Sequence, residues 1–266
     1  MPDRAFFQKE VRVKATPCRC FLKAVRFPNK RGQLISGILH RPEEQKDPPA
    51  ILICHGMLSN KDSRKHIHLA RTLCERGYLM LRFDFSFVGE SEGELSELTY
   101  TGEVEDLRSA VTFIRGETRG AIGLVGSSMG GAVALLYAAE DPGVRALAVL
   151  ACVARPGTFP EEDVSRWEAK GHIDSPLGPI SLAFLKDARE KDALGAAARL
   201  KAPLLLIHGE ADELIPATEA LDLFRAARPP KRLDLLGGAD HRFSEDSHVE
   251  EIGELISGWF ERYLPP

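Results

Sequence analysis

The sequence has no apolar run long enough to cross a bilayer. Its longest runs, such as "ILIC" and "AVALLYAA", fall far short of the ~18 residues that a membrane-spanning helix needs. The N-terminal stretch "MPDRAFFQKEVRVK" carries charge along its length and contains no apolar signal core. We therefore expect a cytoplasmic protein with no membrane partner.

An excess of positive charge is also absent. The 35 Lys and Arg residues face 39 Asp and Glu residues, and both signs are mixed along the chain to give a net charge of −4. Proteins that track nucleic acids carry a basic patch or stripe. We therefore expect a small-molecule substrate and no nucleic acid, and the composition leaves a homo-oligomer open.

Cysteines are few, and their number is odd. The five, at positions 18, 20, 54, 74 and 152, do not suggest a disulfide framework in a chain of this size. Cys18 and Cys20 form a C-x-C pair with no second pair, whereas a structural zinc site needs four ligands. Cys54 and Cys152 lie in or beside apolar runs and are expected to be buried packing residues. No metal or cofactor is predicted.

Strand-like and helix-like patterns alternate along most of the chain. Two alternating segments, 21–27 and 33–40, predict an opening hairpin, and the apolar run 50–56 is typical of a strand buried on both faces of a parallel sheet. Helical spacing follows at 104–114 and again at 249–263. The pattern predicts one α/β domain over residues 1–266, built on a mostly parallel, doubly wound sheet.

A serine between two glycines stands in "GSSMG", residues 126–130, directly after a strand-like run and before a helix-like one. One interpretation is steric, because small residues suit any tight turn. The other is a nucleophile elbow, in which glycines let the backbone hold an exposed serine hydroxyl in a strained conformation. The five residues alone do not decide between the two interpretations, so the rest of the chain must.

An acid and a histidine follow in the order that a serine nucleophile needs. Asp212 lies just beyond the apolar strand "PLLLIHG", and His241 lies in a glycine-rich loop after the next strand. Serine, then acid, then histidine is the chain order of α/β-hydrolases. The acid has two rivals, Glu210 and Asp240. The histidine has one serious rival, His208, whose place at a strand end favours a packing or hydrogen-bonding role, while His66, His68, His172 and His248 look like ordinary surface positions.

Several segments together resemble the α/β-hydrolase superfamily: "HGM" (55–57), "RFDFSFVGESEG" (82–93), "GSSMGG" (126–131), "HGEADELIP" (208–216) and "GADHRF" (238–243). Within it the chain is similar to single-domain feruloyl and cinnamoyl esterases and to dienelactone-hydrolase-like and serine-aminopeptidase-like hydrolases. The resemblance implies a catalytic set of Ser128, Asp212 and His241. It also implies an oxyanion hole formed by the backbone N–H groups of Met57 and Met129. We expect His55 to brace the loop that carries Met57 and not to take part in catalysis.

The activity implied is that of a serine carboxylesterase acting on small, acyl or aryl esters through an acyl-enzyme on Ser128. A peptidase or amidase, a thioesterase and a non-catalytic binding protein stay open as alternatives. Phe87 and Val88 stand where relatives usually carry a glycine and a small or polar residue, which predicts a bulkier, more apolar pocket.

One segment, 155–201, interrupts the alternation. It is rich in Pro, Gly and charge, shows helical candidates and no clear strand, and is too short for a core of its own. Both its ends lie at the sheet edge where Ser128 is expected. We therefore predict a small helical cap over the serine, with Trp167 and Phe184 lining the substrate pocket.

Overall fold

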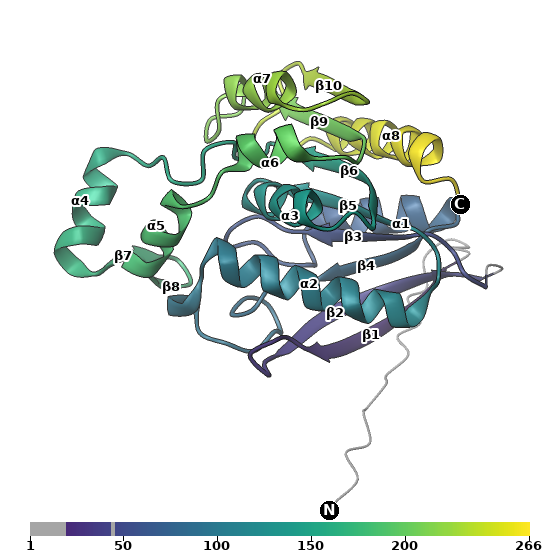
Figure 1. Ribbon diagram of the computed structural model, residues 1–266, viewed down its shortest axis with the longest axis horizontal. Coiled ribbons are helices and arrows are strands. Elements are labelled where there is room, and N and C mark those ends of the chain that lie inside the picture. The colour runs from purple at the N-terminus through teal and green to yellow at the C-terminus, as the bar shows by residue number, and fades with distance from the viewer. Residues whose placement is uncertain (1–19, 44–45) are drawn as a thin grey trace, which may run out of the picture.

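The computed structural model describes residues 20–43 and 46–266, which build an eight-stranded sheet flanked by helices (Figure 1). The strand order is β1-β2-β4-β3-β5-β6-β9-β10. The β1–β2 and β2–β4 pairs are antiparallel and the others parallel, so the predicted α/β fold with a mostly parallel sheet and an opening hairpin is confirmed. The strands are β1 (Cys20–Pro28), β2 (Leu34–Pro42), β3 (Ala50–Cys54), β4 (Leu79–Phe83), β5 (Ile122–Ser127), β6 (Val144–Leu150), β9 (Leu204–Gly209) and β10 (Lys231–Leu236).

Helices cover both faces of this sheet. One face packs against α1 (Arg64–Glu75) and α8 (Asp246–Tyr263), whose apolar stripes share a core with alternate residues of the strands. The other face packs against α2 (Tyr100–Glu117), α3 (Met129–Glu140), α6 (Ala193–Arg199) and α7 (Ala217–Ala226). The central strands are consequently buried along their whole length, as continuous apolar runs predict. No helix in the described part of the chain is long and apolar enough to cross a membrane.

A disulfide joins Cys20 of β1 to Cys74 of α1, with a Cα–Cα distance of 6.3 Å. The expectation that the cysteines form no disulfide is therefore wrong for this pair. Cys20 is not available to a metal, and its C-x-C partner, Cys18, lies outside the described residues. Cys54 and Cys152 are free and buried, as predicted.

The insertion after β6 differs from the all-helical cap that the sequence suggests. Between α4 (Glu161–Lys170) and α5 (Leu182–Arg189) it contains a small antiparallel hairpin of β7 (His172–Ser175) and β8 (Gly178–Ser181). The indole N–H of Trp167 donates to the carbonyl oxygen of Ile180 at 2.9 Å and ties α4 to this hairpin. In Figure 1 these elements project beyond the main sheet. Strands of four residues flanked by Pro and Gly leave too short a pattern to be recognised in a sequence.

Candidate active site

Ser128 sits on a sharp turn between β5 and α3. Its backbone has φ 55° and ψ −122°, a conformation that residues other than glycine seldom adopt. A side chain at Gly126 would place its Cβ 2.4 Å from the carbonyl oxygen of Gly130, and one at Gly130 would place its Cβ 2.2 Å from the carbonyl oxygen of His55. The two glycines are therefore required by close backbone packing, and the turn they permit has the strained form of a nucleophile elbow.

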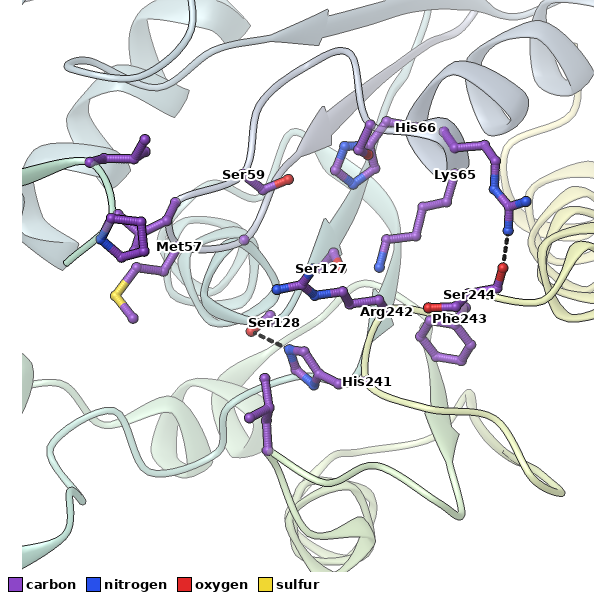
Figure 2. A pocket seen from close by; sticks show the side chains of 17 residues that line it. Met57, Ser59, Lys65, His66, Ser127, Ser128, His241, Arg242, Phe243 and Ser244 are labelled. Carbon is purple, nitrogen blue, oxygen red and sulfur yellow. Dashed lines mark hydrogen bonds between the residues drawn. The ribbon is translucent and has the colours of Figure 1, made fainter.

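The three residues of the predicted catalytic set lie together in the structure, and Figure 2 shows the contact between Ser128 and His241. His241 Nε2 is 3.1 Å from Ser128 Oγ, and His241 Nδ1 is 2.8 Å from Asp212 Oδ2. Ser128 follows β5, Asp212 follows β9 and His241 follows β10. Because these strands are parallel, their carboxyl ends meet at one edge of the sheet. The carboxylate thus holds Nδ1 as the protonated nitrogen and leaves Nε2 facing the serine hydroxyl.

The side chain of Asp212 is fully buried yet held as a carboxylate. Burial alone would raise its pKa, but hydrogen bonds from His208, His241 and the backbone N–H of Ile215 lower the pKa well below its usual value. His208 Nε2 lies 3.2 Å from Asp212 Oδ2 and 2.9 Å from the carbonyl oxygen of Ile215. Because a carbonyl only accepts, this nitrogen carries a proton and donates. His208 therefore has the hydrogen-bonding role expected of it, as a support for the acid.

The rival acids have other surroundings. Asp240 accepts hydrogen bonds from the backbone N–H and hydroxyl of Ser244, at 2.7 and 2.6 Å, and Glu210 is exposed. Glu213, which the sequence did not single out, accepts from the backbone N–H of His241 at 3.2 Å. Asp212 is the acid in contact with the His241 imidazole in the described chain.

The two predicted oxyanion donors flank the serine. A Cβ at Gly56 would lie 3.1 Å from the Ser128 Cβ, so the loop that carries Met57 rests directly against the nucleophile. Met129 is the first residue of α3, at the positive end of the helix dipole. Within residues 20–43 and 46–266, neither backbone N–H group has a hydrogen-bond acceptor. Their role in binding an oxyanion stays a prediction.

His55 braces the loop beneath, as expected. Its Nδ1 donates to the carbonyl oxygen of Gly56 at 2.9 Å, and its Nε2 accepts from the backbone N–H of Phe85 at 3.0 Å. Burial lowers the pKa of this imidazole, so the ring is neutral and fits an acceptor role at Nε2. The side chain fixes the loops after β3 and β4 to each other through these two contacts.

A cavity of about 700 Å³ opens over Ser128, within the range of roughly 300–1,000 Å³ that is usual for ligand sites. Part of its wall is apolar, and another part is polar and basic. Apart from Met57, the sequence pattern did not indicate these residues as pocket lining, although Arg242 directly follows the predicted catalytic histidine. The apolar residues are Met57, Leu58, Pro176, Leu177 and Leu214, and the polar and basic ones include Ser63, Arg64, Lys65, His66 and Arg242.

The four predicted pocket residues do not line this cavity, which corrects the prediction. Trp167 and Phe184 are buried in an aromatic cluster with Phe159, and Phe184 also stacks on Tyr100 of α2 with centroids 5.8 Å apart. Their large apolar surfaces are buried between the insertion and the main domain, and the two side chains therefore do not extend into the cavity.

Phe87 and Val88 likewise pack against the main core, Phe87 partly buried and Val88 buried. The insertion nevertheless contributes to the cavity, through Pro176 and Leu177 in the turn between β7 and β8. The insertion therefore reaches the cavity through this turn and not through the aromatic residues assigned to the lining, and its role as a cap stays a prediction.

The chain is similar to a known protein family and to individual proteins. The family described as serine aminopeptidase, S33, matches residues 45–171. The uncharacterized protein YqkD of Bacillus subtilis is 32% identical over 227 residues, which cover 82% of this chain and 72% of YqkD. Mouse ABHD10, a mitochondrial palmitoyl-protein thioesterase, is 27% identical over 263 residues, covering 93% of this chain and 84% of its own length.

A solved structure is also similar to this chain. The crystal structure of the esterase domain of a Rhodothermus marinus protein superposes with a TM-score of 0.72 and 27% identity, covering 91% of this chain and 99% of that domain. The sheet order, the elbow at Ser128 and the Ser–Asp–His order along the chain agree with these likenesses. The chain belongs to the α/β-hydrolase superfamily.

Proposed function

We propose that this protein is a serine carboxylesterase that cleaves small, acyl or aryl esters through an acyl-enzyme on Ser128. The observation that carries the proposal is the continuous hydrogen-bonded chain from Ser128 Oγ through His241 to the buried carboxylate of Asp212. The strained elbow exposes that hydroxyl to the cavity, where a nucleophile is needed.

In the proposed reaction, His241 Nε2 accepts the proton of Ser128 as Oγ attacks the ester carbonyl carbon. Asp212 stabilises the imidazolium that forms, and the N–H groups of Met57 and Met129 donate to the oxyanion. The imidazolium then gives its proton to the leaving alcohol. A water molecule, deprotonated by the same imidazole, hydrolyses the acyl-enzyme and restores the serine.

The apolar wall of the cavity supports ester substrates with an alkyl or aryl part. Met57, Leu177 and Leu214 are 40%, 56% and 59% exposed, which is unusual for large apolar side chains gathered at one site and typical of a binding surface. The likeness to ABHD10 favours a thioesterase as the second candidate, because an acyl thioester uses the same nucleophile and oxyanion hole.

The test is covalent labelling combined with a substrate panel. We expect a fluorophosphonate probe to modify one residue, Ser128, identified by mass spectrometry of peptides. 4-Nitrophenyl esters of increasing acyl length should then be cleaved with larger kcat/KM than the matched acyl thioesters or aminoacyl anilides. Labelling at another residue would refute the assignment, and a preference for thioesters or anilides would replace esterase by the corresponding alternative.

In acid, kcat/KM should decrease in proportion to the loss of a single ionisation. Neutral imidazole is the form of His241 that can accept the serine proton, so kcat/KM should fall as pH decreases. Because the pKa of Asp212 lies well below its usual value, its carboxylate stays ionised throughout this limb. We therefore expect log kcat/KM to fall with a slope of about one per pH unit. A slope near two, measured where the fold is intact by circular dichroism, would mean that the acid titrates together with the histidine.

A further inference from the structure

The two sides of the cavity differ in chemistry. Figure 2 shows Met57 on one side of Ser128, and Lys65 and Arg242 on the other. Met57 is apolar, and the cavity lining also includes the exposed apolar side chain of Leu177. A bound ester at Ser128 would therefore extend toward apolar groups in one direction and toward cations in the other.

Lys65 and Arg242 have no ion-pair partner among the residues that the structure describes. The Lys65 ammonium lies 5.1 Å from the centroid of the Phe243 ring, and no carboxylate contacts it within 4.0 Å. The nearby carboxylates are already engaged, Asp212 by the two histidines and Asp240 by Ser244. Burial lowers the pKa of Lys65 to about 8, opposed by the charges of Asp240 and Asp212, so the group is still largely cationic at neutral pH.

A third basic residue, Arg64, lines the same side but is partly neutralised. Its guanidinium pairs with Asp246 and donates to the carbonyl oxygen of Ser244. The first turn of α1, which begins at Arg64, contains no acidic residue. The positive end of the helix dipole therefore adds to the charge of Lys65.

Two buried polar atoms on this side also lack partners in the described chain. Ser63 Oγ and His66 Nε2 are both enclosed and unbonded, and both residues line the cavity. His66 is 1% exposed, and its Nδ1 lies 3.3 Å from the carbonyl oxygen of Asn60. Buried polar atoms are normally satisfied, so these two make this wall of the cavity polar and leave its hydrogen bonding incomplete.

We infer that the natural substrate is an anionic ester, in which a carboxylate lies toward Lys65 and Arg242 while the scissile carbonyl lies at Ser128. The inference rests on the proposed function and names the class of ester within it. Lys65 would donate to the carboxylate, and Arg242 would neutralise it from the rim. The apolar remainder of the substrate would lie against Met57 and Leu177.

The test compares each anionic ester with its neutral carboxamide isostere. One arm places the charge on the acyl side, with monoethyl esters of succinate, adipate and suberate. The other arm places it on the leaving group, with 4-acetoxybenzoate against 4-acetoxybenzamide. We expect one arm to show a preference for the anion of about tenfold in kcat/KM, the size expected of a charge-assisted hydrogen bond. The arm that shows it identifies which half of the ester carries the charge.

The variants Lys65→Met and Arg242→Gln should each reduce the anion-to-amide ratio several-fold, and added salt should reduce it in the wild type. The matched control is Lys201→Met, which removes an exposed lysine outside the cavity and should leave the ratio unchanged. Because a ratio is compared within each variant, a general loss of activity does not imitate the effect.

Binding to the Ser128→Ala variant separates the two proposals. The same ligand pairs are titrated by calorimetry, which needs no hydrolysis. If esters are hydrolysed but neither arm favours the anion, the inference is overturned and the esterase proposal stands. If no ester is hydrolysed but the carboxylates still bind more tightly than the amides through Lys65, the anion site stands and the esterase proposal fails. An anion preference that survives both substitutions overturns the assignment to these residues.

Discussion

Replacing Ser128 by alanine should lower kcat/KM for esters by about ten thousand-fold to a million-fold and abolish fluorophosphonate labelling. The hydroxyl is the group that forms the covalent bond, so its removal leaves His241 and Asp212 with no nucleophile to activate. The fold should persist, because Ser128 Oγ makes one hydrogen bond, to His241, and the alanine Cβ keeps the backbone contacts. Steady-state kinetics and thermal unfolding measure the two effects separately.

The matched control is Ser109→Ala, which removes another partly buried serine hydroxyl, in α2, bonded to the carbonyl oxygen of Glu105. It should leave ester hydrolysis near the wild-type rate. A Ser128→Ala protein that retains more than about one hundredth of the wild-type kcat/KM, with unchanged circular dichroism, would contradict the role given to this serine.

The catalytic set was predictable because it depends on strand order more than on side-chain packing. Ser128, Asp212 and His241 each follow a strand of a parallel sheet, and such strands end at one edge. The sequence pattern therefore placed the three residues together, although 113 positions separate Ser128 from His241 and 29 separate Asp212 from His241. The elbow was recognisable for the same local reason, since glycines on both sides of a serine limit the possible backbone shapes.

The lining of the cavity was not predictable in the same way. Large aromatic side chains such as Trp167 and Phe184 pack where they bury the most apolar surface. In this chain that place is the contact between the insertion and α2. The residues of the insertion that reach the cavity, Pro176 and Leu177, form the turn of a hairpin whose strands are four residues long. The Cys20–Cys74 bond was missed because sequence spacing does not fix disulfide connectivity.

His66 is a different case, because the sequence did contain a signal. The interpretation as a surface residue is wrong, since the side chain is buried. Positions 66, 69, 70 and 73 follow helical spacing, and Leu69, Ala70 and Leu73 form the buried stripe of α1. The histidine continues that stripe into the cavity, so the periodicity indicates its burial but not its neighbours.

The second large effect is expected for Gly130→Ala, at the start of α3. In an ordinary helix this change would be favourable by up to about 1 kcal/mol, because alanine has the higher helix propensity. Here the new Cβ would lie 2.2 Å from the carbonyl oxygen of His55 and 2.5 Å from that of Cys54. Both atoms belong to backbone that cannot rotate away, so β3, the His55 loop or α3 must shift. We expect the free energy of unfolding to fall by about 3 kcal/mol.

Activity should fall with stability, and for the same reason. A shift of α3 moves Ser128 relative to the Met57 loop, which packs against it through Gly56. A displacement of about 1 Å costs on the order of a hundredfold in rate when groups must be aligned. The control is Gly258→Ala in α8, where no atom lies within 4 Å of the new Cβ. That variant should be as stable as the wild type or slightly more stable. If denaturant unfolding and ester kinetics of Gly130→Ala match those of Gly258→Ala, close packing at this glycine does not determine the geometry of the elbow.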